Sequence, residues 1–81
     1  ARVPTDTSCR INYGLMLARN GRQAEAVTNL SAVLKPAEVY YNLASLYEQL
    51  GNKDQARREY QHALELDPNL WEAQSRLSKL D

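Results

Sequence analysis

The segment of residues 37–69, AEVYYNLASLYEQLGNKDQARREYQHALELDPN, constrains the fold more than any other part of the sequence. Small and apolar residues recur in it every three or four positions, in two sets. The first set is Tyr40, Leu43, Ala44 and Tyr47, and the second is Ala56, Tyr60, Ala63 and Leu64. Such spacing places each set on one face of a helix. Gly51 between the sets and Pro68 after them predict a helical hairpin closed by a tight turn.

These residues resemble the tetratricopeptide repeat, a family of helical hairpins with a consensus of about 34 residues. The consensus runs aromatic, Leu-Gly, Tyr, Ala, Phe and Pro, and the segment follows it in step. The matching residues are Tyr40, Leu43, Ala44, Tyr47, Ala56, Tyr60, Ala63 and Pro68. The resemblance implies an all-α fold, a right-handed superhelix of stacked antiparallel helical hairpins.

A second, weaker copy of this pattern precedes the segment. Gly21 lies 30 positions before Gly51, and the same offset pairs several further residues. The pairs are Asn12 with Asn42, Tyr13 with Leu43, Gly14 with Ala44, Leu17 with Tyr47, Ala26 with Ala56, Leu30 with Tyr60 and Val33 with Ala63. The copy lacks an aromatic residue where the later one has Tyr40, and it is shorter by about one helical turn. We therefore interpret residues 5–35 as a degenerate repeat unit and residues 36–68 as a consensus unit.

Helix start and stop signals predict five helices and no strand. We expect the helices at about residues 5–20, 23–34, 37–50, 53–66 and 70–80, after a frayed arm at residues 1–4. Thr5, Asn52 and Asn69 are candidate N-caps, because a short polar side chain accepts a backbone N–H of the first turn. Arg22 stands at the corresponding place of the second helix. Because arginine is a poor N-cap, we expect this helix to be less stable by roughly 1 kcal/mol. The last segment, residues 69–81, is either a capping helix or the start of a third unit.

Two glycines indicate where helices end. Gly21 and Gly51 follow helical segments, and glycine adopts the positive φ of such helix ends without strain. The Asn20-Gly21 pair is also typical of strand hairpins, but its flanks have helical rather than alternating periodicity. We therefore predict a helix end at each glycine.

Small residues indicate where helices touch. The first hairpin has Gly14 and Ala26 in matching places, and the second has Ala44 and Ala56. A larger side chain at these places should push the two helices apart, at a cost of about 1–3 kcal/mol. We therefore expect close helix contacts at these four residues.

Composition narrows the classes of function. The 81 residues include ten basic and ten acidic side chains, so no net field attracts nucleic acid or an anionic membrane surface. No run approaches the roughly 18 apolar residues of a membrane-spanning helix. The single Cys9 cannot form an internal disulfide or half of a zinc site, so cysteine usage does not indicate whether the compartment is oxidising or reducing. Because the chain begins at Ala1 rather than Met, we expect a processed protein or part of a longer one.

The sequence indicates no enzyme and no cofactor. It contains no nucleophile paired with a base, no phosphate-binding loop and no pair of catalytic carboxylates. His62 has no metal-ligand pattern around it, so we expect a solvated surface histidine. Cys9 is either a half-buried packing residue, the stronger expectation, or a reactive thiol near a helix start. Arg57 and Arg58 could bind phosphate, but their acidic neighbours favour a charge-balanced, solvated face.

The resemblance implies a binding surface on the concave side of the array, lined by the first helix of each hairpin. On this side we place Ile11, Asn12, Leu15 and Arg19 from the first helix, Tyr41, Asn42, Ser45 and Glu48 from the third, and Ser75, Arg76 and Lys79 from the last. In peptide-binding members of the family an asparagine at the place of Asn42 holds the peptide backbone through its donor and its acceptor. Asparagine is also common there in repeats without a ligand, so both interpretations stay open.

One subfamily, the chaperone co-factors, grips a C-terminal carboxylate with lysines, asparagines and an arginine. Asn42 and Arg76 match that set. Ile11 and Leu15 stand where the subfamily has a lysine and an asparagine, and Glu72 stands at the place of a further lysine. These departures argue against chaperone tails. The remaining groove, part apolar and part basic, suits an extended segment with a hydrophobic side chain and an acidic end.

Two functions of different class follow. The first is a non-catalytic interaction module that binds a peptide or a partner protein in the groove. The second is a structural spacer or a fragment of a longer array, which self-associates through Arg10, Tyr13 or the last helix, or stacks on further repeats. Trp71 fits either function, because it either folds over the end of the fourth helix or serves as an aromatic anchor.

Overall fold

The computed structural model describes residues 7–80 of the chain. The helices in this range are α1 (Thr7–Arg19), α2 (Gln23–Ser31), α3 (Pro36–Gln49), α4 (Lys53–Leu66) and α5 (Trp71–Leu80). The described residues contain no strand, so the all-α prediction with five helices is confirmed. The expected arm at residues 1–4 and the Thr5 cap lie outside the described residues.

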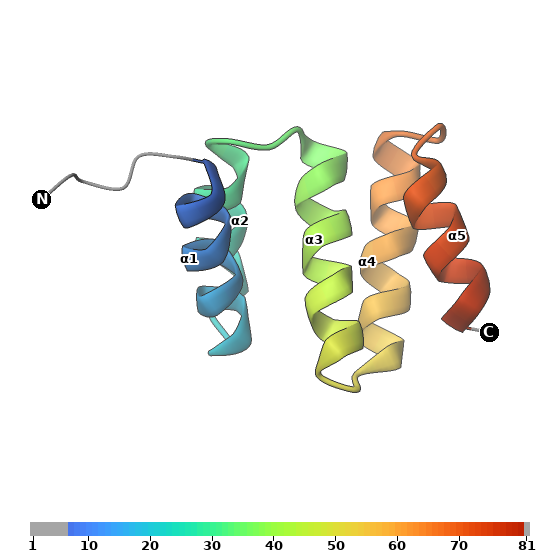
Figure 1. Cartoon of the computed structure of the whole chain (residues 1–81), viewed down its shortest axis with the longest axis horizontal. Coiled ribbons are helices and arrows are strands. Elements are labelled where there is room, and N and C mark those ends of the chain that lie inside the picture. The colour runs from blue at the N-terminus through green and yellow to red at the C-terminus, as the bar shows by residue number, and fades with distance from the viewer. Residues whose placement is uncertain (1–6, 81) are drawn as a thin grey trace, which may run out of the picture. The chain divides into compact units, whose positions relative to one another are not determined.

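The chain divides into two compact units, residues 1–34 and residues 35–81. In the first unit α1 packs against α2, and in the second unit α4 contacts both α3 and α5 (Figure 1). Each pair of successive helices is joined by a short turn, which makes α1–α2 and α3–α4 antiparallel hairpins. The superhelical stacking of the hairpins stays a prediction.

The two glycine turns have the predicted conformation. Gly21 has φ of +82° and Gly51 has φ of +83°. In each turn the residue after the glycine donates its backbone N–H to a carbonyl five positions earlier, over 2.9 Å in both cases. This arrangement satisfies carbonyls that the helix end would otherwise leave unpaired, and a side chain at the glycine would strain it.

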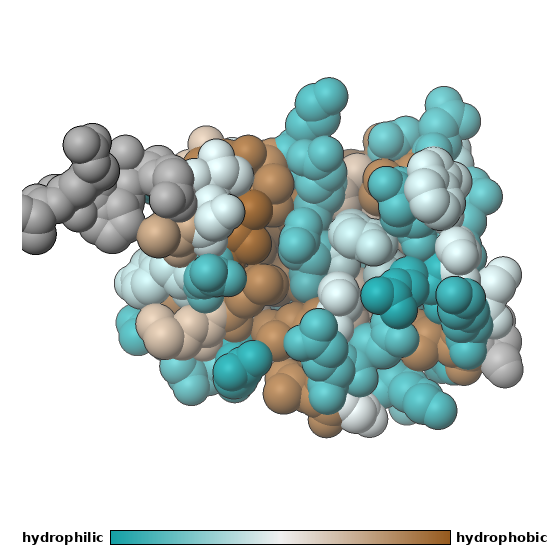
Figure 2. All heavy atoms as spheres, viewed as in Figure 1, coloured by the Kyte–Doolittle hydropathy of each residue, from teal (hydrophilic) through white to brown (hydrophobic). Residues whose placement is uncertain are grey.

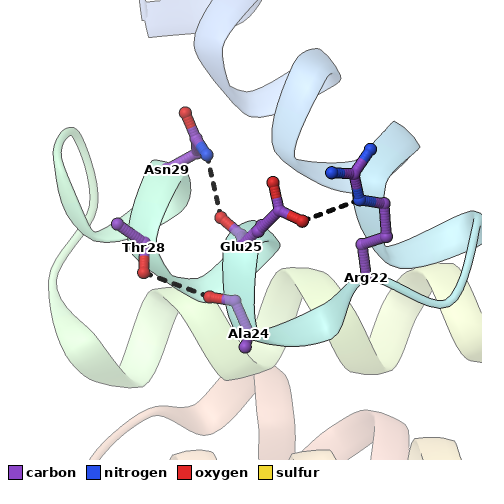
Figure 3. Close-up of polar contacts among 5 residues, drawn as sticks. All are labelled: Arg22, Ala24, Glu25, Thr28 and Asn29. Carbon is purple, nitrogen blue, oxygen red and sulfur yellow. Dashed lines mark hydrogen bonds and ion pairs between the residues drawn. The ribbon is translucent and has the colours of Figure 1, made fainter.

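The helix starts differ between the two hairpins as the sequence predicts. The Asn52 side chain accepts the backbone N–H of Gln55 over 3.3 Å and so caps α4. Arg22 makes no side-chain cap at the start of α2. Its Nε instead donates to the Glu25 carboxylate over 2.7 Å, on the exposed side of the first turn (Figure 3). An exposed ion pair of this kind contributes little, so α2 has the weaker start.

One expected helix boundary and one expected cap are wrong. Helix α2 ends at Ser31 rather than at residue 34, because the backbone N–H groups of Ala32 and Val33 donate to carbonyls three positions earlier, over 3.3 Å and 3.1 Å, so the last turn is tighter than an α-helix. Helix α5 begins at Trp71 without a cap from Asn69. The backbone N–H of Asn69 instead donates to the Asp67 carboxylate over 3.1 Å in the preceding turn.

The core of the first unit depends on the closest approach between its two helices. Gly14 on α1 is buried against Leu30 on α2, whose side chain has no exposed surface. A Cβ atom on Gly14 would lie only 2.6 Å from Cγ of Leu30. Ala26 is also fully buried. The expected close helix contact at Gly14 is therefore confirmed.

The core of the second unit joins all three of its helices. One cluster of its fully buried residues consists of Ala44, Ala56, Tyr60, Ala63 and Ala73. Partly buried side chains surround them: Tyr40, Tyr41, Tyr47, Leu64, Leu70, Leu77 and Leu80. Because alanines occupy the contact points, the helix backbones approach closely and the larger Tyr60 fills the remaining space. Helix α5 thus buries its apolar face within this unit, which leaves its other face for solvent or a ligand.

Candidate functional site

A shallow pocket of about 180 Å³ lies between α3 and α5 in the second unit. Its lining residues are Tyr41, Trp71, Glu72, Ser75, Arg76 and Lys79. Four of them, Tyr41, Ser75, Arg76 and Lys79, belong to the predicted groove. Figure 2 shows that the visible face over α3 and α5 is mostly hydrophilic, with apolar atoms only in small areas. The structure therefore brings four of the seven second-unit residues of the predicted groove into one pocket of mixed polar and apolar lining.

The spacing of the α5 residues explains why they share a pocket. Helical residues three or four positions apart lie on one face, and Trp71, Ser75 and Lys79 follow that spacing with Glu72 and Arg76 beside them. The apolar residues Ala73, Leu77 and Leu80 lie on the other face and join the core. The apolar face of α5 thus packs against the core, and its polar face lines the pocket.

A carboxylate on α3 connects the pocket to the core. The Tyr60 hydroxyl on α4 donates to Oε1 of Glu48 over 2.8 Å. On the other side, Nη1 of Arg76 on α5 lies 3.7 Å from Oε2 of Glu48. Burial, followed by the hydrogen bond to Glu48, raises the pKa of Tyr60 above its usual value of 10.0. The phenol therefore stays neutral and holds the carboxylate in place.

Tyr41 is the second residue that fixes Arg76. Its ring packs against that of Tyr60, with centroids 5.8 Å apart and planes at 57°. A side-chain hydrogen bond with Tyr41, followed by the charge of Glu48, raises the pKa of Arg76. The guanidinium is thus held toward α3, although 45% of its side-chain surface remains exposed.

Asn42 and Ser45 are also half-buried on α3, but they do not line this pocket. The Asn42 amide donates to the backbone carbonyl of Glu38 over 2.8 Å. Asn29 on α2 makes the same bond to the Glu25 carbonyl (Figure 3). One amide N–H of Asn42 is therefore committed to its own helix, and a ligand could use the second N–H and the oxygen.

The four predicted groove residues of the first unit all lie on α1. Ile11 and Leu15 are half-buried, and Asn12 and Arg19 are exposed. These degrees of exposure are compatible with a ligand-facing surface. Their participation in one groove with the α3 and α5 residues stays a prediction.

Trp71 and Glu72 line the pocket but were not among the predicted groove residues. The expectation that Trp71 folds over the end of the fourth helix is wrong, because 68% of its surface is exposed. The helical spacing from Trp71 to Ser75 and Lys79 is a sequence signal that could have placed it on the same face. Its neighbour Leu70 packs against the core instead.

Two other sequence expectations need correction. His62 is half-buried and stacks on Tyr40, with ring centroids 3.9 Å apart and planes at 20°, so it is not simply solvated. Cys9 is exposed rather than half-buried. It lies in the first turns of α1 and lines a pocket with Arg10, Tyr13 and Asn29. Both outcomes depend on neighbouring helices, which residue spacing within one helix does not reveal.

Comparison with known protein families matches residues 37–70 to the tetratricopeptide repeat. The chain contains a tetratricopeptide repeat. The match covers α4 and all of α3 but Pro36, and it ends at residue 70, directly before α5, so it coincides with the more regular of the two hairpins. A search of curated proteins found no match. Tetratricopeptide repeats are in general non-catalytic modules for protein interaction. Within residues 7–80, no helix has the length and apolar character needed to cross a membrane.

Proposed function

We propose that this tetratricopeptide repeat chain is a non-catalytic module that binds an extended segment of a partner protein in its groove. The observation that carries the proposal is the pocket between α3 and α5, which combines an exposed indole with charged and hydroxyl groups. Exposed tryptophan and arginine are the side chains that most often dominate the energy of protein interfaces. Here Trp71 and Arg76 lie five positions apart on α5 and line the same pocket.

The size of the pocket supports a peptide rather than a small molecule. Sites for small organic ligands usually enclose about 300–1,000 Å³. This pocket measures about 180 Å³ and is shallow, which fits one or two side chains of a longer ligand. An extended segment also offers backbone groups that the Asn42 amide can pair with.

The proposed binding surface is larger than the pocket itself. In the second unit it includes Tyr41, Asn42, Ser45, Glu48, Ser75, Arg76 and Lys79. The repeat offset assigns the corresponding surface of the first unit to Ile11, Asn12, Leu15 and Arg19 on α1, where Ile11 and Leu15 would contact apolar side chains of a ligand. The basic residues of α5 would contact its acidic end.

The proposal can be tested by titrating isotope-labelled protein with partner-derived or library peptides and following backbone amide shifts. We expect the shifts to concentrate on α3 and α5, and Trp71→Ala should abolish binding. Ser78→Ala is the matched control, because Ser78 is exposed on α5 but does not line the pocket. Shifts confined to α2 and α4 would rule out the groove.

A second function, self-association as a structural spacer, is favoured by a separate surface on the first unit. Tyr13 and Met16 on α1 are each 49% exposed. A pocket of about 330 Å³ lined by Cys9, Arg10, Tyr13 and Asn29 lies beside them. Sedimentation velocity at several concentrations distinguishes the two functions. A spacer should form larger species that Tyr13→Ser dissociates, whereas an interaction module should stay monomeric.

A further inference from the structure

The order of the charged residues along the α3–α5 pocket indicates more specifically which ligand the pocket binds. We propose that the pocket selects an extended segment with one basic and one acidic side chain four residues apart. This inference rests on the proposed function, because it specifies the ligand of the same groove.

The N-terminal end of the pocket favours a cation. Trp71 is 68% exposed there, and Glu72 stands beside it in the pocket lining. An indole face attracts an ammonium or guanidinium group, and tryptophan is the strongest of the aromatic side chains in this role. The adjacent carboxylate adds to that attraction. A lysine or arginine of the ligand therefore fits over Trp71.

The other end of the pocket favours an anion. Lys79 lines it two turns further along α5. Among residues 7–80, neither Lys79 nor Glu72 forms an ion pair. Arg76 is different, because its Nη1 lies 3.7 Å from Oε2 of Glu48. Lys79 is thus the cation that an incoming carboxylate meets, while Arg76 mainly holds α5 against α3.

The length of α5 sets the spacing of the two charges. Trp71 and Lys79 are eight positions apart, which corresponds to about 12 Å at a rise of 1.5 Å per residue. In an extended chain, side chains on the same side are two or four positions apart, or about 7 Å and about 13 Å. Only the four-residue spacing approaches the distance between the two ends. The residue midway between the charges points to the same side and lies near Tyr41 and Ser75, where an apolar side chain fits.

Fluorescence gives a site-specific test, because Trp71 is the only tryptophan of the chain. The probes are end-capped peptides of sequence Gly-Lys-Ser-Leu-Ser-Glu-Gly and its reverse charge order Gly-Glu-Ser-Leu-Ser-Lys-Gly. Their isomers Gly-Lys-Leu-Ser-Glu-Ser-Gly and Gly-Glu-Leu-Ser-Lys-Ser-Gly keep the composition but set the charges three residues apart. We expect at least one order to bind about two- to five-fold tighter at spacing four than at spacing three.

A double-mutant cycle assigns each charge to its partner. Glu72→Gln should weaken the spacing-four peptide by at most as much as replacing the peptide lysine by glutamine, which also loses the attraction of the indole, and it should not weaken the glutamine peptide further. Lys79→Gln should behave in the same way toward the peptide glutamate. Ser78→Ala should change neither affinity. Circular dichroism establishes that each variant remains helical.

The outcomes separate this inference from the proposed function. If the spacing-three and spacing-four peptides bind equally well in both charge orders and still shift the Trp71 emission, the predicted charge spacing is wrong and the groove function stands. Absence of coupling in the double-mutant cycle has the same meaning. If no peptide of any charge pattern changes the emission or the amide spectrum of α3 and α5, both the inference and the proposed function fail.

Discussion

Replacing Gly14 by alanine tests the closest helix contact of the first unit. The added Cβ atom would lie 2.6 Å from Cγ and 2.7 Å from Cδ2 of Leu30. Real Cβ atoms do not approach other atoms so closely, so the leucine or the helices must move. Leu30 has no exposed surface and its Cγ is not the flexible end of the side chain. Its displacement therefore disturbs the packing between α1 and α2.

Two opposing effects set the size of the change in stability. Overpacking of a well-filled core costs about 1–3 kcal/mol. Alanine in a helix interior is favoured over glycine by about 1 kcal/mol. The expected net loss in the free energy of unfolding is therefore about 1 kcal/mol, within a range of about 0–2 kcal/mol.

The matched control is the same substitution after Leu30→Ala, which removes both clashing atoms. Leu30→Ala itself should cost about 2–5 kcal/mol, so all variants are compared in a stabilising osmolyte. In that background Gly14→Ala should become stabilising, by up to about 1 kcal/mol. Urea unfolding followed by circular dichroism at 222 nm measures all four proteins. A stabilisation near 1 kcal/mol by Gly14→Ala in the otherwise unchanged protein would refute the reasoning, because Leu30 would then not limit the contact.

Three further predictions concern the helix cap, the core hydroxyl and the exposed indole. Arg22→Asn should stabilise the protein by about 0.5–1 kcal/mol in urea unfolding, because Asn52 caps the equivalent helix of the second unit. Tyr60→Phe should cost about 1–2 kcal/mol, because it removes the 2.8 Å hydrogen bond to Glu48. Since the folded-state pKa of Tyr60 lies above 10.0, its contribution is complete below pH 10 and declines as the pH rises further, so alkaline unfolding should be less steep in the variant. Trp71→Ala should change thermal stability by less than about 0.5 kcal/mol, because the side chain is 68% exposed.

Each of these predictions has a contradicting result. An unchanged urea midpoint for Arg22→Asn would mean that the backbone at this position does not let the new side chain reach the first turn. If the parent protein and Tyr60→Phe unfold identically as the pH rises, Tyr60 does not contribute to the pH dependence of stability. A large loss of stability in Trp71→Ala would show that the indole packs against the protein rather than facing solvent.

Much of the local structure could be predicted from the sequence. The turns at Gly21 and Gly51, the Asn52 cap and the missing cap at Arg22 all depend on groups within five residues of each other. Gly14 was also identifiable, because the repeat offset pairs it with the small residue Ala44. The end of α2 was not predictable from apolar periodicity, because Val33 and Leu34 continue the apolar pattern while the backbone after Ser31 tightens into hydrogen bonds to carbonyls three positions earlier.

The candidate site was only partly predictable. Tyr41, Ser75, Arg76 and Lys79 were placed on the binding side and line one pocket in the structure. Trp71 and Glu72 stand outside the predicted groove, because helical spacing places Trp71 on the face of Ser75 and Lys79 but does not show which α3 residues that face meets. Glu48 accepts a hydrogen bond from Tyr60 and lies near Arg76. Both contacts join residues of different helices, so the spacing within one helix does not reveal them.

The sequence by itself determined that this chain forms helical hairpins and that residues 37–70 are a tetratricopeptide repeat. Periodicity, helix ends and caps suffice for this, because they act over a few residues of one segment. Only the tertiary structure decided which side chains share a pocket, why His62 stacks on Tyr40, and that Trp71 faces outward. These features depend on distances of a few ångströms between different helices, and such distances are set by how the whole core packs.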